Sequence, residues 1–268
     1  MRDADAVFTG SIPALYDGGL GPVLFAPYAR DVAARVAAFA PASVLETAAG
    51  TGIVTRALVA ALPPGTPVLA TDLNQAMLDH AAAQPGAAGV TWRQADAQAL
   101  PVPDAAFDAV VCQFGAMFFP DRRAAFAQAR RVLRPGGRFV LTVWDRLAEN
   151  DLAATVTQAL AALFPADPPA FLARTPYGLH DPEAVRGDLL AAGFSSVTVE
   201  TVPQVSDGVP ARAAAGMCQG TPLRGEIEAR GAVSLDEATR AAAAAITSRF
   251  GDPVCGARMR AHVVSALR

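Results

Sequence analysis

Three acidic residues, Glu46, Asp72 and Asp96, stand within or directly after short apolar runs of the chain. Where parallel strands are covered on both faces, their carboxyl ends share one edge of the sheet, and ligands bind in the crevice at that edge. We therefore expect the three carboxylates to converge on one crevice. There Asp72 could accept hydrogen bonds from two ribose hydroxyls, Asp96 could meet the exocyclic amine of a purine, and Glu46 could orient a cationic amino group.

A turn of small residues, 47–52, lies between the first apolar run and the next helical pattern. Strand, tight turn and helix in this order place backbone N–H groups and a helix N-terminus at the carboxyl end of a buried strand, which suits a nucleotide-like ligand. Gly50 and Gly52 would allow close approach to the backbone. The third glycine of a dinucleotide-binding fingerprint is missing, because that position falls on Ile53 or Thr55. A Walker-type phosphate loop is excluded too, since the chain contains no Lys.

Strand-like and helix-like patterns alternate between residues 43 and 145. Short apolar runs predict strands at 43–48, 68–71, 90–95, 107–112 and 138–144. Helical spacing predicts helices at 53–62, 74–83 and 122–133. Such alternation is typical of parallel β-α-β units, whose strands are covered by helices on both faces. This stretch is therefore predicted to form an α/β core.

The rhythm differs on either side of this core. Apolar residues before residue 40 are spaced for one face of a helix, which Pro41 ends. After residue 145 the patterns predict helices at 150–164, from Pro182 to about 192 and at 236–250, a strand at 196–202, and a final strand in the last ten residues. The Asp181-Pro182 pair is a typical helix start, with Asp at the N-cap and Pro at the first helical position.

Composition narrows the class of protein. The chain has 268 residues, 52% of them hydrophobic, and a net charge of −3, which fits one large domain or one domain with a lid. No basic block suits a nucleic acid, since phosphate contacts need clustered basic side chains. The three Cys residues are too few and too far apart for a disulfide framework or a zinc site. We find no membrane-spanning or signal-peptide pattern, and we expect a cytoplasmic protein without a resident metal.

Five ordered motifs resemble those of the class I S-adenosylmethionine-dependent methyltransferases. Glu46-x-Ala48-x-Gly50-x-Gly52 resembles the first motif, with Ala48 where the first glycine usually stands. The remaining motifs are Ala-Thr-Asp72-Leu-Asn-x-x-Met77-Leu, Gln94-Ala-Asp96-Ala97, Phe107-Asp-Ala-Val-Val-Cys-Gln-Phe-Gly and Arg131-Val-Leu-Arg-Pro-Gly-Gly-Arg-Phe. Together they cover residues 43–145. They look closest to the small-molecule branch, the ubiquinone/menaquinone-type (methyltransferase type 11-like) enzymes.

The resemblance implies a fold and a cofactor. The fold would be Rossmann-like, a doubly wound seven-stranded mixed sheet with helical lid segments. The chain would divide into a helical N-terminal lid segment (1–42), an S-adenosylmethionine-binding core (43–145), and a region that adds lid helices and the last two strands of the same sheet (146–268). The residues that the resemblance assigns to cofactor binding are Glu46, Ala48, Gly50, Gly52, Asp72, Leu73, Met77, Asp96, Ala97 and Gln113.

Each of these positions carries a role from the family. Glu46 would meet the methionine amino group, and Asp72 the ribose hydroxyls. Asp96 and the Ala97 N–H would read the adenine edge. The residues bordering the adenine would be Leu73 and Met77, while Gly50 and Gly52 would let the cofactor lie on the backbone. The position of Gln113 is one whose backbone usually faces the methionine moiety.

The acceptor is less well specified. The loop after the fourth strand, Gln113 to Phe119, is apolar and aromatic, and it lacks the Asn/Asp-Pro-Pro-aromatic motif of the nucleic-acid branches. It suits a small hydrophobic or aromatic acceptor. The alternative is that its aromatic residues only pack against the next helix. The candidate acceptor-binding residues are Tyr16, Phe25, Tyr28, Phe114 and Met117. His180 is the best-placed histidine for a general base, but methyl transfer from a sulfonium needs chiefly an in-line approach, so a base could be absent.

The predicted function is methyl transfer from S-adenosylmethionine to a small organic acceptor. We expect a monomer or homodimer with a role in secondary metabolism. The alternative is an S-adenosylmethionine-binding protein that does not methylate, such as a cyclase or a regulatory homologue. A nicotinamide oxidoreductase is a third and weaker hypothesis.

Overall fold

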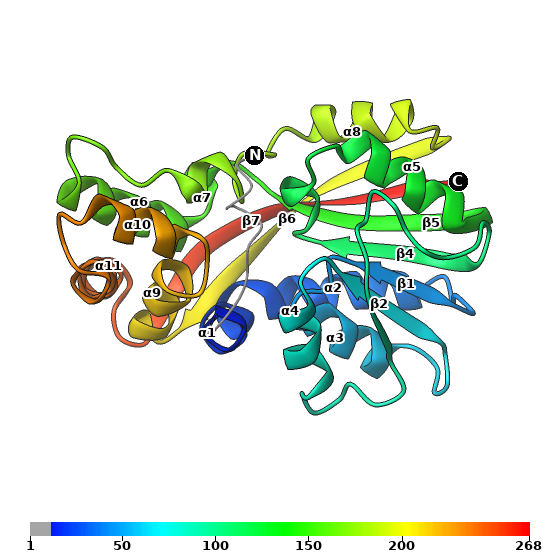
Figure 1. Ribbon diagram of the computed structural model, residues 1–268, viewed down its shortest axis with the longest axis horizontal. Helices are drawn as coiled ribbons and strands as arrows, with labels where there is room; N and C mark the ends of the chain where they lie inside the picture. The colour runs from blue at the N-terminus through cyan, green and yellow to red at the C-terminus, as the bar shows by residue number, and fades with distance from the viewer. Residues whose placement is uncertain (1–11) are drawn as a thin grey trace.

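A seven-stranded sheet runs through the computed structural model, which describes residues 12–268 (Figure 1). The first eleven residues of the predicted lid segment 1–42 lie outside the described residues. The strands are β1 (Val44–Thr47), β2 (Val68–Asp72), β3 (Thr91–Gln94), β4 (Phe107–Gln113), β5 (Leu133–Trp144), β6 (Ser196–Gly208) and β7 (Val254–Leu267). Their order in the sheet is β3-β2-β1-β4-β5-β7-β6, and β7 alone runs antiparallel to both neighbours. The predicted doubly wound, seven-stranded mixed sheet is confirmed.

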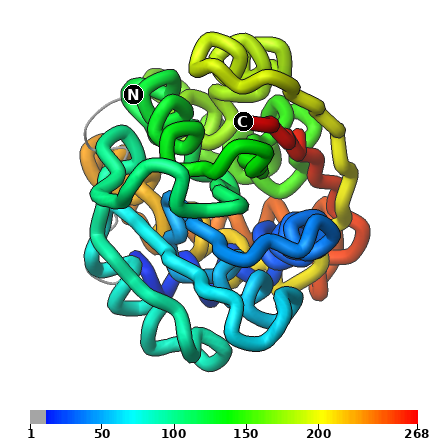
Figure 2. The backbone as a smooth tube through the Cα atoms, turned by 90° about the vertical axis from the view of Figure 1, so that its right-hand side faces the viewer, coloured from blue at the N-terminus to red at the C-terminus, as the bar shows by residue number. Residues whose placement is uncertain are grey.

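Helices cover both faces of the sheet. In Figure 1, α2 (Ala26–Ala37), α3 (Ile53–Ala61) and α4 (Gln75–Ala82) lie below the strands, and α5 (Arg122–Val132) and α8 (Pro182–Ala191) lie above them. The end view in Figure 2 shows the same layers, with the yellow-green segment of α8 at the top and cyan segments near the bottom. This double cover explains why β1 is buried along its whole length and why central strands read as unbroken apolar runs.

The last two strands extend beyond the rest of the sheet. Pairing of β5 with β7 ends at Trp144 and Ala261, whereas β6 and β7 remain paired as far as Gly208 and Val254. This extension carries a group of helices on the left of Figure 1: α6 (Asp151–Leu163), α7 (Phe171–Arg174), α9 (Pro210–Cys218), α10 (Leu223–Arg230) and α11 (Leu235–Phe250). We call these helices, together with α1 (Ile12–Leu20), the helical cap.

Within the helical cap, α1 packs closely against α9. A Cβ built on Gly19 would lie 2.8 Å from the carbonyl oxygen of Arg212 and from the Cα of Gly216, so α1 and α9 approach as closely as glycine allows. A short π-helical turn, η2 (Gly21–Phe25), then leads into α2. The chain thereby passes from the helical cap to the lower face of the sheet within a few residues.

Local signals in the sequence account for several element boundaries. The Asp181 side chain accepts a hydrogen bond from the Glu183 N–H, which confirms it as the N-cap of α8. Asn74 occupies the N-cap position of α4 without a side-chain cap. The strand predicted at 138–144 is longer, because Leu133 already pairs with Phe107 across an irregular register. In the same way β6 runs to Gly208 rather than to residue 202, because β7 offers a partner along the extension.

Buried charges join the sheet to the helical cap just after β5. The Arg260 Nε donates to the Asp145 carboxylate over 2.5 Å. Burial opposes ionisation of Asp145, but hydrogen bonds from the Arg146 N–H and from Arg260 hold its pKa below the ordinary value. Asp151, at the start of α6, accepts from the backbone N–H of Arg258 over 2.8 Å. These contacts fix α6 against the β6–β7 extension.

Short 3-10 turns complete the description: η3 (Ala116–Phe118) follows β4 and η4 (Leu147–Glu149) follows β5. Within residues 12–268, no helix is both long and apolar enough to cross a membrane.

Candidate functional site

A cavity of about 330 Å³ opens where the strand order reverses, between β1 and β4. Residues at the carboxyl ends of β1, β2 and β4 line it, together with the N-terminal Tyr16 and Phe25. Its volume lies in the usual range of small-molecule sites. We call it the main cavity. Its position is the one at which open α/β sheets bind ligands.

Most of the residues predicted to bind a cofactor meet at this cavity. Those that line it are Glu46, Ala48, Gly50, Asp72, Leu73, Met77, Asp96, Ala97 and Gln113. Of the predicted acceptor residues, Tyr16, Phe25 and Phe114 line it as well. The three acidic residues therefore share one cavity, as the strand-end argument predicted.

Gly52 is placed differently from this prediction, because it does not line the main cavity. A Cβ there would lie 2.9 Å from the Trp92 ring and 3.0 Å from the Ala81 Cβ, and its φ is +76°. Glycine at this position allows β3 and α4 to pack against the start of α3. Gly50 differs, since a Cβ there would meet no atom within 4 Å. Of the two glycines, only Gly50 presents its backbone to the main cavity.

The Asp72 carboxylate connects the turn after β1 to the start of α4. It accepts hydrogen bonds from the backbone N–H groups of Gly50 and Asn74, each over 2.8 Å. Burial raises the pKa of Asp72, and these N–H donors partly offset the rise by stabilising the charged form. The Asn74 side chain and the Leu73 N–H also hydrogen-bond to this carboxylate and act in the same direction.

Glu46 is the most deeply buried acid at the main cavity, with 1% of its surface exposed. Its Oε2 accepts from the Thr55 hydroxyl over 2.6 Å. Burial raises the pKa of Glu46 to about 8; the Thr55 hydrogen bond opposes the rise and the nearby Asp72 charge adds to it. Near neutral pH the carboxyl is therefore largely protonated, and a cationic group beside it would favour ionisation.

Gln113 contributes an unused hydrogen-bond acceptor. Its Nε2 donates to the carbonyl oxygen of Phe25 over 3.3 Å. Its Oε1 is buried and has no hydrogen-bond partner among the described residues. A buried polar atom without a partner is costly, and at a cavity wall it indicates a ligand that carries a donor. The family role predicted for this position concerned the backbone, whereas the structure brings in the side chain.

The alanine that replaces the usual first glycine has a structural compensation. Ala48 adopts φ +52°, in the left-handed region that glycine occupies most easily. Its methyl group faces Gly115: a Cβ built on Gly115 would lie 2.5 Å from the Ala48 Cβ and 2.9 Å from the Cys112 Sγ. The substitution at residue 48 is therefore accommodated by a glycine on the loop after β4.

Asp17 ties the helical cap to the turn of the main cavity, a role that the sequence analysis missed. Its carboxylate accepts from the Thr51 hydroxyl over 2.8 Å and from the Arg56 guanidinium over 3.1 Å. The neighbouring Tyr16 thereby lies at the wall of the main cavity. Nothing in the local sequence marks Asp17, because its partners are more than 30 residues away along the chain.

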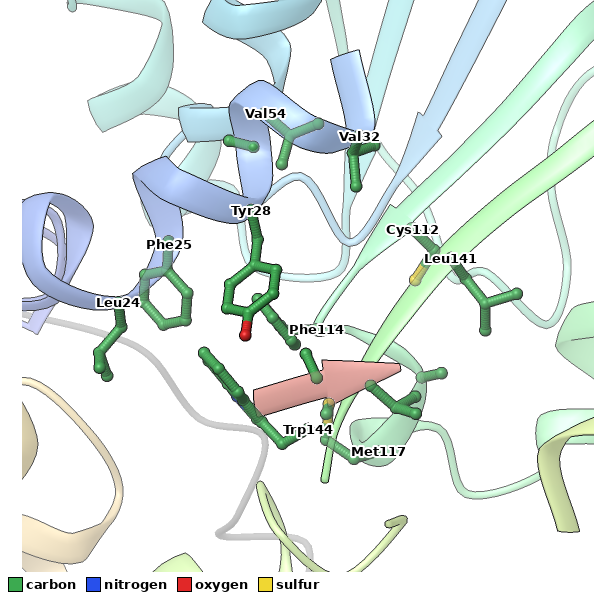
Figure 3. Close-up of a cluster of buried hydrophobic side chains, with 14 of the residues drawn as sticks. Leu24, Phe25, Tyr28, Val32, Val54, Cys112, Phe114, Met117, Leu141 and Trp144 are labelled. Carbon is green, nitrogen blue, oxygen red and sulfur yellow. The ribbon is translucent and has the colours of Figure 1, made fainter. Parts of the chain in front are cut away.

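Besides Gly52, three further predicted residues lie away from the main cavity. Tyr28 is fully buried and its hydroxyl donates to the carbonyl oxygen of Val202 over 2.9 Å, so it is part of the core shown in Figure 3. Met117 lines a second, smaller cavity. His180 is exposed, and its Nδ1 lies 3.0 Å from the carbonyl oxygen of Tyr177. It lines neither cavity, and no other histidine of the described residues does.

The second cavity, of about 40 Å³, shares a wall with the main cavity. The residues that line both are Tyr16, Phe25, Phe114 and Phe118. Its other walls include Trp144 at the end of β5 and Phe171 and Tyr177 around α7. We call it the aromatic cavity. The sequence analysis did not identify these three side chains, because they meet only through the packing of the helical cap.

Comparison with known proteins bears on these residues directly. Residues 45–141 match the family described as "Methyltransferase domain". The chain is 41% identical over 109 residues to the ubiquinone/menaquinone biosynthesis C-methyltransferase UbiE of Acidiphilium cryptum, covering 39% of this chain and 43% of that relative. The chain spans less than half of the length of the first curated relatives it matches. The matched segment contains the quoted motifs, and it agrees with the methyltransferase family that they predicted.

Solved structures share the architecture. The YcgJ protein of Bacillus subtilis is 20% identical with a TM-score of 0.54, over 89% of this chain and 98% of that one. The [4+2]-cyclase SpnF is 18% identical with a TM-score of 0.51, over 89% of this chain and 80% of that one. At such identity these likenesses show the fold alone.

We predict that Gly115→Ala lowers the free energy of unfolding by about 1–3 kcal/mol, because the new methyl group would overlap Ala48 and Cys112. Urea unfolding followed by circular dichroism measures the loss. Adding Ala48→Gly removes the nearer overlap and should restore part of it. Gly225→Ala on α10, where a Cβ meets no atom within 4 Å, is the matched control and should cause no loss. A Gly115→Ala protein as stable as the wild type would contradict the compensation.

Cofactor binding should release a proton from Glu46. Its pKa is raised from the ordinary 4.5 to about 8, so between these values folding takes up a proton, and the contribution of Glu46 to stability falls as the pH rises. A cationic amino group reverses the preference, so the affinity should increase as the pH rises toward about 8 and fall above it, where the α-amino group of the ligand loses its charge. Calorimetry in two buffers of different protonation enthalpy measures the released proton. Glu46→Gln has no proton to release; equal release from both proteins would refute the assignment.

Proposed function

Because residues 45–141 place this chain in the class I S-adenosylmethionine-dependent methyltransferase family, we propose that it transfers a methyl group from S-adenosylmethionine to a small apolar or aromatic organic acceptor. The observation that carries the proposal is the adjacency of two unlike cavities. The main cavity holds buried carboxylates and an unused amide oxygen, and it shares four side chains with a cavity whose walls are aromatic and aliphatic and carry no charged side chain of the described residues.

The residues of the main cavity fit the cofactor by their chemistry. Asp72 accepts from the ribose hydroxyls while its bonds to Gly50 and Asn74 hold the carboxylate in place. Glu46 faces the cationic amino group, and the Gln113 Oε1 is free to accept a hydrogen bond from the same end of the ligand.

At the other end of the cavity, Asp96 and the Ala97 N–H recognise the edge of the adenine. Leu73 and Met77 border its ring; the Leu73 side chain is 54% exposed and is therefore open to contact with a stacked ring. The Asp96 Oδ1 also accepts from the Gln98 N–H over 2.8 Å, which fixes the direction of the carboxylate.

The bound cofactor supplies a methyl group on a positively charged sulfur. The chain contributes mainly position and exclusion of water, which together account for a large part of such a reaction. Tyr16, Phe25, Phe114 and Phe118 supply an apolar wall between the two sites. Since His180 lies away from both cavities, we assign it no part in proton transfer, and we propose that the reaction proceeds without a histidine base.

A protein that binds S-adenosylmethionine without methylating is the alternative. The fold admits it, since SpnF is a cyclase of the same architecture. The family match favours methyl transfer, because it is to a methyltransferase domain and spans the turn, β2 and the loop after β4. The two functions differ in whether the methyl group leaves the cofactor.

The proposal is tested by following S-adenosylhomocysteine release. The protein is incubated with S-adenosylmethionine and a panel of phenols, aromatic ketones and amines, and the products are quantified by mass spectrometry. We expect S-adenosylhomocysteine and a methylated phenol or ketone in equal amounts. An acceptor that is converted while the cofactor stays methylated would favour the alternative.

Asp72→Ala should weaken S-adenosylmethionine binding by about tenfold to a hundredfold, because hydrogen bonds to a charged group are worth about 1.5–3 kcal/mol each. Asp108→Ala is the matched control. Asp108 lies at the opposite end of β4, where it pairs with Arg134 and accepts from Ser43, so its loss should affect stability and leave affinity unchanged. Equal affinities of Asp72→Ala and wild type, measured by calorimetry on folded protein, would refute the ribose assignment.

A further inference from the structure

The walls of the aromatic cavity are apolar for the most part and uncharged. The rings of Phe114 and Trp144 stack at 3.8 Å with an angle of 3° between their planes. Trp144 in turn lies 5.7 Å from the ring of Tyr177. No charged side chain of residues 12–268 lines this cavity. These rings pack mainly against one another, and a charged group entering the cavity would find no partner, so the cavity favours a neutral ligand over an ammonium group or a phosphate.

Two hydrogen-bond donors at this cavity form no hydrogen bond with any described residue: the Tyr177 hydroxyl and the Trp144 indole N–H. Tyr177 is 4% exposed and lines the cavity. Other buried hydroxyls nearby are paired: Thr221 donates to the carbonyl oxygen of Met217, and Tyr28 to that of Val202. Buried tyrosine hydroxyls usually find a partner, so an unpaired one at a cavity wall indicates a ligand that supplies it. Burial also raises the pKa of Tyr177, which keeps the hydroxyl protonated and able to donate.

The location of the aromatic cavity relates this hydroxyl to the proposed reaction. Four side chains line both cavities, so a molecule in the aromatic cavity borders the main cavity directly. The free volume of about 40 Å³ is smaller than a substituted benzene ring. Entry of such a ring therefore requires side chains of the shared wall, such as Phe25 on η2, to turn aside.

We infer that the aromatic cavity is the acceptor site and selects a neutral aromatic ring bearing a hydroxyl or carbonyl oxygen, to which the Tyr177 hydroxyl donates. This inference rests on the proposed function for its link to methyl transfer. Tyr177 is then a specificity-determining residue that distinguishes an oxygen-bearing ring from its hydrocarbon counterpart. A site built to hydrogen-bond a ligand oxygen rejects the analogue that lacks it, because the buried group is left unpaired.

The test compares phenol with toluene, which has nearly the same shape without the oxygen. Ligand-observed NMR titrations are run on the full chain, with and without S-adenosylhomocysteine. The wild type should bind phenol roughly tenfold more tightly than toluene. Tyr177→Phe should reduce this ratio to about one, leave S-adenosylhomocysteine affinity unchanged, and melt at about the same temperature, since the hydroxyl that it removes has no hydrogen bond within the described residues.

Tyr28→Phe is the matched control, because it removes a buried hydroxyl that is already bonded within the protein. It should lower the melting temperature and keep the preference for phenol. A wild type that binds phenol no better than toluene, or a Tyr177→Phe protein that keeps the preference, overturns the inference. Failure of the proposed function would appear separately, as a wild type that does not bind S-adenosylhomocysteine, while the phenol ratio measured without it still tests the cavity.

Discussion

The hydrogen bond from the Gly50 N–H to the Asp72 carboxylate is the interaction on which the site depends. Over 2.8 Å it joins the turn after β1 to the end of β2, and these two strands pair in parallel, so that their carboxyl ends share one edge. The turn needs positive φ angles at Ala48, Gly50 and Gly52, a conformation that an isolated chain would seldom adopt. Asp72 holds this turn at the edge of the main cavity. The other two acidic residues of that cavity, Glu46 and Asp96, lie on its wall as well.

The site stores unfavourable electrostatics that a suitable ligand would relieve. Glu46 and Asp72 are both buried, and the pKa of each is raised by that burial. The Gln113 Oε1 is buried and has no hydrogen-bond partner among the described residues. Each group would be stabilised by a ligand with a cationic amino group and ribose hydroxyls. The cavity is thus more complementary to a charged nucleoside than to water, which is the physical basis for assigning it to S-adenosylmethionine.

The sequence was sufficient to predict the sheet, the cofactor and most of the main cavity. Strand ends that share an edge are implied by chain order, so Glu46, Asp72 and Asp96 could be brought together without coordinates. Gly52 shows the limit: a glycine does not reveal whether its missing Cβ makes room for a ligand or for Trp92 and Ala81. Phe25 and Tyr28 were equally good candidates, and both rings contact Phe114, but only Phe25 reaches the main cavity, while the Tyr28 hydroxyl is bonded to Val202 in the core.

The helical cap was the least predictable part. Trp144 and Tyr177 lie 33 positions apart by their numbers, and their rings meet only because α6 and α7 fold back over the end of β5. Asp17 likewise finds its partners through the packing of α1 against the turn. Such contacts depend on tertiary packing of segments whose own patterns indicate only helix, so no local signal identifies them.

The central claim is that the main cavity binds S-adenosylmethionine rather than a dinucleotide. Calorimetric titration of the folded chain with S-adenosylmethionine, and in parallel with NADPH, tests it most directly. The structure predicts saturable one-site binding of S-adenosylmethionine and no binding of NADPH, since the turn lacks the third glycine that a pyrophosphate site requires. Saturable binding of NADPH, with none of S-adenosylmethionine, would contradict the account.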